Sequence, residues 1–275
     1  MSYPMKMIPT FLAAAGLAIL GSLSEAQSFD VDDVVKAHVI PGWRGSDGRH
    51  VAALHLELGD GWKTYWRAPG DAGIPPRFNW AGSRNVSEVK VDWPMPKQIP
   101  QGRYMTIGYD SSVTLPLHVA PKAAGQAMQL KGEIELGVCR EVCIPVKVSV
   151  AQDLPNAKGK RDPAIVASLA ARPYSASEAG VSHVACRMSP MEGGLKLSAV
   201  ITMPKLGARE VTVFEVGDPK IWVAPSKSER QGSKIVAQTE MQHVSGRSFA
   251  LKRPDVRITV LGQGRAVEIQ GCPAG

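Results

Sequence analysis

The sequence predicts an all-β protein in which a β-sandwich is followed by a second β-rich domain. After residue 30, apolar and polar residues alternate with a period of two in many short runs, as they do in half-buried strands. Turn-forming sequences separate these runs, and the 275-residue chain contains 27 Gly and 21 Pro but few stretches with helical periodicity. Short strands spaced by turns in this way are typical of sandwich architectures.

The first group of predicted strands lies in residues 27–152, which we expect to form the first domain. The run VAALHLEL over 51–58 shows the alternation clearly, and turn sequences follow at 59–61, 69–71 and 121–122. The expected strands of this group are 51–58, 86–91, 113–119, 130–136 and 146–150.

A linker with one short helix is expected over residues 153–175. The sequence NAKGKRDP over 156–163 has the polar, Gly- and Pro-containing composition of a connecting segment. The run AIVASLAA over 164–171 predicts a helix, with Asp162 as a candidate N-cap and Pro163 at the first helical position.

Strands resume after this linker, and residues 176–275 are expected to form the second β-rich domain. The same alternation and turn signals support this group. Its expected strands are 181–188, 195–202, 210–216, 221–224, 235–238, 248–251, 256–261 and 266–269.

Residues 1–26 have the features of an export signal. Lys6 supplies a positive charge, an apolar run follows over 8–20, and Ser24-Glu25-Ala26 places small residues at the positions that a signal peptidase reads. The run is shorter than the roughly 20 apolar residues that span a bilayer. We therefore expect cleavage near Ala26 and a mature protein in the periplasm, with an uncleaved anchor as the alternative.

The charge pattern argues against nucleic acid as a partner. The formal net charge is +7, but the basic residues are mostly scattered singly, and the densest cluster is KGKR over 158–161. An exported chain without a basic stripe is unsuited to nucleic-acid binding, whereas scattered cations give a solvated surface with some affinity for anionic partners.

Four cysteines allow three pairings, of which the nearest-neighbour pairing keeps each bridge within one predicted domain. Cys186 and Cys272 would enclose roughly 87 residues, for which the chain-entropy model gives about 4–5 kcal/mol, and this bridge is expected to be structural. Cys139 and Cys143 would face each other across a hairpin loop over 140–142. From spacing alone, that second pair is either a static staple or a redox-active disulfide.

A resemblance to a known family covers residues 60–150. The matching sequences are GWKTYWRAPGDAGIPP over 61–76, FNW over 78–80, WPMP over 93–96, IGYD over 107–110, LPL over 115–117, and Cys139 and Cys143 followed by IP over 144–145. This ordered series resembles the N-terminal periplasmic domain of the DsbD family of thiol–disulfide reductases. The resemblance implies an immunoglobulin-like sandwich that accepts electrons from a membrane partner and passes them to periplasmic disulfide proteins.

Carried over by position, the resemblance makes Cys139 and Cys143 the catalytic redox pair, with Cys143 as the attacking sulfur. Residues 103–109 would form the loop that covers the pair, with Tyr104 as the lid, Met105 beside it and Tyr109 as the second candidate. The alternative is that both tyrosines pack inside the sandwich. The implied partners are thioredoxin-like or disulfide isomerase proteins of the periplasm and a separate membrane electron donor, a setting that includes cytochrome c biogenesis.

The leading functional hypothesis is therefore a thiol–disulfide oxidoreductase that acts as an electron carrier and needs no cofactor. A second hypothesis is copper binding, because Cys186, Met188 and Met191 offer soft sulfur atoms at close spacing. A third is a plain binding module in which both disulfides are inert. The six histidines form no cluster with carboxylates at metal-ligand spacing, and no nucleophile–base motif or phosphate loop appears.

Overall fold

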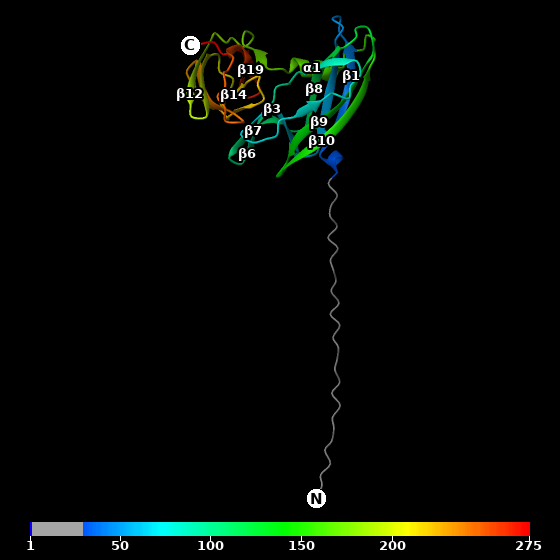
Figure 1. The fold of residues 1–275 in the computed structure, drawn as a ribbon, viewed down its shortest axis with the longest axis horizontal. Coiled ribbons are helices and arrows are strands. Elements are labelled where there is room, and N and C mark those ends of the chain that lie inside the picture. The colour runs from blue at the N-terminus through cyan, green and yellow to red at the C-terminus, as the bar shows by residue number, and fades with distance from the viewer. Residues whose placement is uncertain (2–29) are drawn as a thin grey trace. The chain divides into compact units, whose positions relative to one another are not determined.

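In the computed structural model, which describes Met1 and residues 30–275, four β-sheets build the described fold (Figure 1). Apart from Met1, the predicted export signal lies outside the described residues. Residue contacts divide the chain into Met1–Asp30 and Val31–Gly275, and all four sheets belong to the second unit. The result is an all-β, immunoglobulin-like fold, as predicted. No helix among the described residues has the length and apolar character needed to span a membrane.

Two sheets face each other in the first half of this unit, after the short 3-10 turn η1 (Val31–Asp33). The four-stranded sheet has the order β1 (Val35–Arg44), β2 (His50–Leu58), β8 (Ser112–Pro121), β5 (Val86–Val91). The six-stranded sheet has the order β10 (Cys143–Leu154), β9 (Met128–Cys139), β3 (Lys63–Gly70), β7 (Tyr104–Tyr109), β6 (Lys97–Gln101), with β4 (Arg77–Asn79) also paired to β9.

The core between these sheets is formed by the inward residues of the alternating strands. On β9, Leu130, Ile134 and Leu136 are buried while the residues between them are mostly exposed, which is the pattern expected of a strand with one solvated face. Among the described residues, Trp66 on β3 is the largest side chain that is fully buried. Sheet-on-sheet burial of this kind is the main source of stability of the first half.

The predicted helix is present as α1 (Pro163–Ala170), with Asp162 as its N-cap. The Asp162 carboxylate accepts a hydrogen bond from the backbone N–H of Ala164 over 2.8 Å, which satisfies an amide that the helix itself leaves free. Ile165 is fully buried and the Ser168 hydroxyl donates to the carbonyl of Thr114 on β8. The helix is thus attached to the first pair of sheets.

The second half contains the other two sheets. One has the order β11 (Tyr174–Ser175), β19 (Ala266–Gln270), β18 (Arg257–Leu261), β14 (Val211–Glu215). The other has the order β12 (His183–Met191), β13 (Gly194–Thr202), β17 (Lys234–His243), β15 (Ile221–Val223), with β16 (Lys227–Gln231) also paired to β17; the 3-10 turn η2 (Arg253–Asp255) precedes β18. The strand predicted over 248–251 is wrong, because this segment has no strand pairing, and Phe249 and Leu251 pack onto the second core as loop residues.

Side chains of the two halves contact each other within the unit Val31–Gly275. Leu261 and Ala266, from the second half, belong to the first hydrophobic cluster. Arg67 on β3 donates two hydrogen bonds to Glu215, over 2.8 and 3.0 Å, and a third to Glu268 over 2.6 Å. The two halves therefore share both apolar packing and an ion-pair network.

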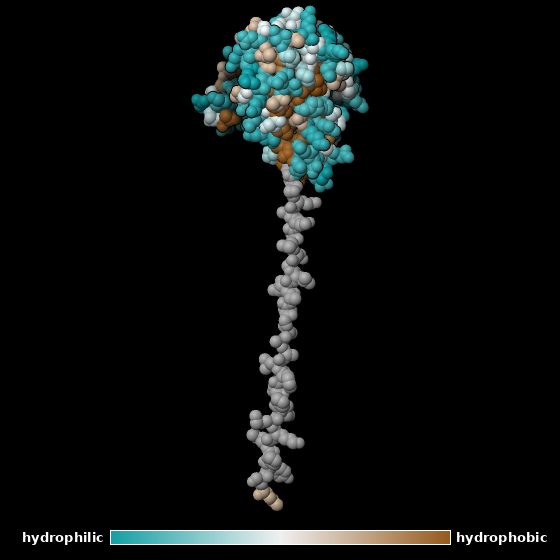
Figure 2. All heavy atoms as spheres, turned by 90° about the vertical axis from the view of Figure 1, so that its right-hand side faces the viewer, coloured by the Kyte–Doolittle hydropathy of each residue, from teal (hydrophilic) through white to brown (hydrophobic). Residues whose placement is uncertain are grey.

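Figure 2 shows a face dominated by hydrophilic residues, with a narrow hydrophobic band along its middle.

Candidate functional site

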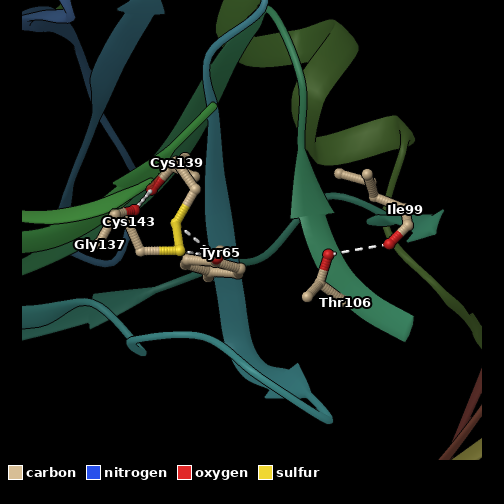
Figure 3. The surroundings of a disulfide bond; sticks show 7 residues. Tyr65, Ile99, Thr106, Gly137, Cys139 and Cys143 are labelled. Carbon is tan, nitrogen blue, oxygen red and sulfur yellow. Dashed lines mark hydrogen bonds between the residues drawn. A yellow bond between two sulfur atoms is a disulfide. The ribbon is translucent and has the colours of Figure 1, made fainter. Parts of the chain in front are cut away.

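The candidate site is the β9–β10 hairpin, where both strands end on a cysteine. β9 ends at Cys139 and β10 begins at Cys143, and these two residues are paired directly across the ladder. Residues 140–142 form the three-residue loop that the sequence predicts. The two sulfurs are bonded to each other, with the Cα atoms 4.1 Å apart (Figure 3).

The two cysteines differ strongly in their exposure. Cys139 is fully buried, because its strand β9 lies between β10 and β3, and Lys63 of β3 is paired with it on the other side. Cys143 is exposed, since β10 is the edge strand of the sheet. A molecule that approaches the hairpin from solvent therefore meets Cys143 first.

A buried tyrosine contacts both sulfurs. The phenol oxygen of Tyr65 lies 2.6 Å from Cys139 Sγ and 3.2 Å from Cys143 Sγ (Figure 3). A sulfur in a disulfide carries no hydrogen, so the Tyr65 hydroxyl is the donor in these contacts. Tyr65 is only 1% exposed, and this burial raises the pKa of its phenol, which keeps the proton available for donation at neutral pH.

Two glycines make room for the Tyr65 ring. A Cβ on Gly137 would lie 3.1 Å from Tyr65 Cδ2 and 2.6 Å from the Cβ of Ile74, and a Cβ on Gly73 would lie 2.7 Å from the ring. Both distances to the ring are closer than ordinary van der Waals contact, so a side chain at either position would displace the tyrosine or the chain at residues 73–74. These glycines allow the ring to reach the sulfurs.

Apolar and cationic side chains surround the exposed cysteine. Val142, in the cysteine loop, is 69% exposed, and Ile74, beside Gly137, is 39% exposed. The Arg140 guanidinium lies 5.3 Å from the centre of the Trp62 ring, where it makes a cation–π contact. The surroundings of Cys143 thus combine exposed apolar side chains with a cation.

The segment predicted to be the covering loop has a different structure. Residues 104–109 are strand β7 and not a loop, and Tyr109 is buried in the core, with its hydroxyl donating to the Pro94 carbonyl over 2.8 Å. Tyr104 is 43% exposed at the start of β7, where Arg103 lies over its ring, and Met105 follows it half-buried. Within residues 30–275, the side chain that hydrogen-bonds the two sulfurs is Tyr65. The lid role of Tyr104, Met105 and Tyr109 stays a prediction.

Sequence reasoning missed Tyr65, although the residue lies inside the quoted 61–76 motif. No signal in the sequence alone singles it out, because its link to the cysteines is the pairing of Lys63 with Cys139, and residues i and i+2 of a strand share a face. Lys63 and Tyr65 thus point to the side of the sheet on which Cys139 and Cys143 lie.

The other cysteine pair is distant from solvent. Cys186 and Cys272 are bonded, and both are buried, at 2% and 1% exposure. The Cys186 amide donates to the Pro273 carbonyl over 2.8 Å, so the bridge and the backbone together hold the C-terminal segment on β12. The four cysteines are thus joined in the nearest-neighbour arrangement, and the described residues contain no free thiol.

The fold and the site define a class: an immunoglobulin-like β-protein that holds a half-exposed disulfide at the end of a hairpin. Residues 31–155 match the family described as "Thiol:disulfide interchange protein DsbD, N-terminal". No curated protein matches the chain.

Solved structures extend the likeness of the fold beyond this domain. The N-terminal periplasmic domain of ScsB from Proteus mirabilis has a TM-score of 0.62 at 20% identity, and the match covers 88% of this chain and 92% of that one. The C-terminal domain of the AgI/II polypeptide BspA from Streptococcus agalactiae has a TM-score of 0.21 at 7% identity, over 86% of this chain and 98% of that one, which is too low to indicate a common fold.

Proposed function

We propose that this protein is a periplasmic thiol–disulfide interchange protein that passes electrons through Cys139 and Cys143. A membrane reductant would supply the electrons, and periplasmic disulfide proteins of the thioredoxin-like or disulfide isomerase kind would receive them. The observation that carries this proposal is the asymmetric disulfide, with Cys143 exposed on an edge strand and Cys139 buried behind it. The match of residues 31–155 to the interchange family supports it.

The exchange begins with the reduced pair. The Cys143 thiolate attacks one sulfur of the partner's disulfide, so that a Cys143–partner bond forms, the partner's own bond breaks, and the released partner thiolate takes up a proton. Cys139 then loses its proton and attacks Cys143 Sγ, which forms the Cys139–Cys143 bond and releases the partner's second sulfur. Two electrons and two protons pass to the partner, and the membrane reductant restores the pair by the reverse sequence.

Exposure favours this assignment of the two roles. Cys143 is the sulfur-bearing residue that a large partner can reach, whereas Cys139 is enclosed by β3 and β10 and needs to reach only its neighbour. Tyr65 supports the reaction, because a hydroxyl beside both sulfurs can donate to whichever sulfur carries negative charge.

Single cysteine replacements in the full chain test the proposal. Cys139→Ser leaves the exposed Cys143 without its resolving partner, so a mixed disulfide with a client should accumulate on non-reducing gels of cells that express the variant. Cys143→Ser should trap far less, because the remaining thiol is buried. If neither variant traps a partner, and if the wild-type pair stays oxidised in strongly reducing glutathione buffer, the disulfide is a static staple and the protein a binding module.

The copper hypothesis loses its thiolate in this structure, since Cys186 is bonded to Cys272. Export through residues 1–26 and a part in cytochrome c biogenesis remain predictions, for which fractionation of cells and cytochrome c content of a deletion strain are the direct measurements.

A further inference from the structure

A cleft of about 890 Å³ lies between the two halves of the unit Val31–Gly275. The first half supplies the β3–β4 connection and the β6–β7 turn, and the second half supplies β14, β15 and the chain around them. The β3–β4 connection also reaches the disulfide. Asp71 and Pro75 line the cleft, while Gly73 and Ile74 between them lie against Tyr65 and Gly137.

Exposed apolar side chains lie both in the cleft and beside the disulfide. Tyr104, Trp222 and Val244 line the cleft and are 43%, 53% and 71% exposed. Ile74 and Val142 are exposed beside the disulfide, as described above. Five of the eight large apolar side chains that are exposed in the described residues thus lie in these two adjoining places. Exposed tryptophan and tyrosine gathered in this way mark contact surfaces for other proteins.

The charges of the cleft are unbalanced in favour of cations. Arg77, Arg103 and Arg209 line it, are exposed, and have no ion pair within residues 30–275. Its carboxylates, by contrast, are already engaged inside the protein.

Asp71 accepts a hydrogen bond from the Met105 amide over 2.7 Å, and Asp218 accepts one from the Lys220 amide over 2.9 Å. Glu215 accepts two from Arg67. Arg67 and Glu215 pair with each other, so the three remaining guanidinium groups outnumber the carboxylates of Asp71 and Asp218, and the lining is positive on balance, in agreement with the formal net charge of +7.

The walls of the cleft are held in place by bonds between the two halves. Arg67, which lines the cleft, bonds to Glu215 and Glu268, and the Gln98 side-chain amide donates to the Leu261 carbonyl over 3.1 Å. A cleft that is fixed before binding loses less conformational entropy when a ligand enters.

We propose that this cleft is the docking surface for the exchange partner, and that the partner presents there an acidic segment carrying a large apolar side chain. Acidic groups would pair with Arg77, Arg103 and Arg209, and the apolar side chain would pack on Tyr104 and Trp222. The identity of the occupant as the exchange partner rests on the proposed function. The charge and apolar character of the occupant rest on the cleft alone.

Binding of synthetic peptides to the oxidised full chain tests the proposal without any redox step. The probe is a cysteine-free peptide in which glutamates flank a leucine–phenylalanine pair, and the comparison peptide has lysines in place of the glutamates. Calorimetry measures the affinity of each peptide. Peptide binding should also change the tryptophan fluorescence, and loss of this change in Trp222→Phe would place the bound peptide at Trp222.

The glutamate peptide should bind and the lysine peptide should not. Arg103→Gln combined with Arg209→Gln should weaken binding about tenfold, which corresponds to about 1.4 kcal/mol. The matched control is Lys36→Gln combined with Arg49→Gln, which removes the same charge from β1 and from the loop that precedes β2, and it should leave the affinity unchanged. Equal binding of the two peptides, or an equal loss in the control, would overturn the proposal. A third outcome would also overturn the proposal: neither peptide binds, but the wild-type protein binds phosphatidylserine vesicles and the double cleft variant does not. The cleft would then contact a membrane and not a protein.

A second assay separates this inference from the proposed function. Reduced protein is mixed with bis(2-hydroxyethyl) disulfide, a small neutral reagent that has no need of the cleft, and the exchange rate is measured. The double cleft variant should exchange at the wild-type rate. Absence of exchange in the wild type would defeat the proposed function, whereas normal exchange with no selective peptide binding would defeat the docking proposal alone.

Discussion

The hydroxyl of Tyr65 donates a hydrogen bond to Sγ of Cys139 over 2.6 Å, across 74 residues of sequence. The tyrosine comes from β3 and the cysteine from the adjacent strand β9, so the contact is built into the pairing of the six-stranded sheet. Its consequence is a buried proton donor placed where a thiolate must form on reduction.

Tyr65→Phe should raise the pKa of the cysteine that carries the thiolate in the reduced protein, by about one unit or more, because a hydrogen bond to a charged group contributes about 1.5–3 kcal/mol. Exchange with bis(2-hydroxyethyl) disulfide at neutral pH should slow accordingly, since a smaller fraction of the thiol is ionised. Titration of the thiolate absorbance in the ultraviolet measures the shift.

Tyr109→Phe is the matched control for this substitution. It also removes a buried hydroxyl from the same sheet, but the hydroxyl donates to Pro94 and not to a sulfur. It should lower stability and leave the thiol pKa unchanged. An equal pKa shift in both variants would mean that Tyr65 acts only through packing.

Gly137→Ala should disturb the site because the new methyl group would crowd Ile74 and Tyr65. The new Cβ would lie 2.6 Å from Ile74 Cβ and 3.1 Å from Tyr65 Cδ2, so the chain at residue 74 or the ring must move. Overpacking of this kind costs about 1–3 kcal/mol, which urea denaturation would detect as a lower midpoint with an unchanged slope.

Gly217→Ala serves as the comparison, because its Cβ would meet Asp255 at 3.8 Å, an ordinary contact. Its effect on the midpoint should be small. A stable Gly137→Ala protein with normal exchange kinetics would show that Tyr65 is free to shift without loss.

Removal of the buried bridge should affect stability and not exchange. Replacing Cys186 and Cys272 together by serine should lower the free energy of unfolding by about 2–5 kcal/mol, because the bridge closes a long loop. Exchange at Cys139 and Cys143, measured at a temperature where the variant is folded, should keep its wild-type rate. A change in that rate would show that the second half influences the redox pair.

The period-two pattern predicted several of the strands that have one solvated face, although it missed β1. β2, β9 and the hairpin loop at 140–142 follow directly from the alternation of VAALHLEL and LKGEIEL and from the cysteine spacing. β3 and β7 were missed because their sequences, KTYWRAPG and YMTIGY, are buried on both faces over four consecutive residues and show no alternation.

The geometry at the sulfurs depends on β3, one of these missed strands, which explains why the site was only half predictable. The cysteine pair could be read from its spacing, but Tyr65 reaches it only because β3 lies beside β9 with Lys63 opposite Cys139. The cleft is still less accessible to sequence reasoning, since its walls come from residues more than a hundred positions apart.

His118 and Asp92 should make stability depend on pH. Nε2 of His118 lies 2.8 Å from Oδ2 of Asp92, and this hydrogen bond raises the pKa of the histidine and lowers the pKa of the aspartate. The contribution of the charged pair is therefore present while His118 is protonated and Asp92 ionised. It is lost as the pH rises through the raised pKa of His118, and also as the pH falls through the lowered pKa of Asp92.

His118→Gln should accordingly reduce the melting temperature more at mildly acidic pH than at pH values well above the histidine's range. Both side chains are about one-third exposed, so the difference should be small but measurable by calorimetry at low ionic strength. His183→Gln is the control, because His183 is exposed at the start of β12 and has no ion pair within residues 30–275. A pH-independent loss in His118→Gln would assign the effect to packing, since only the charged pair responds to protonation.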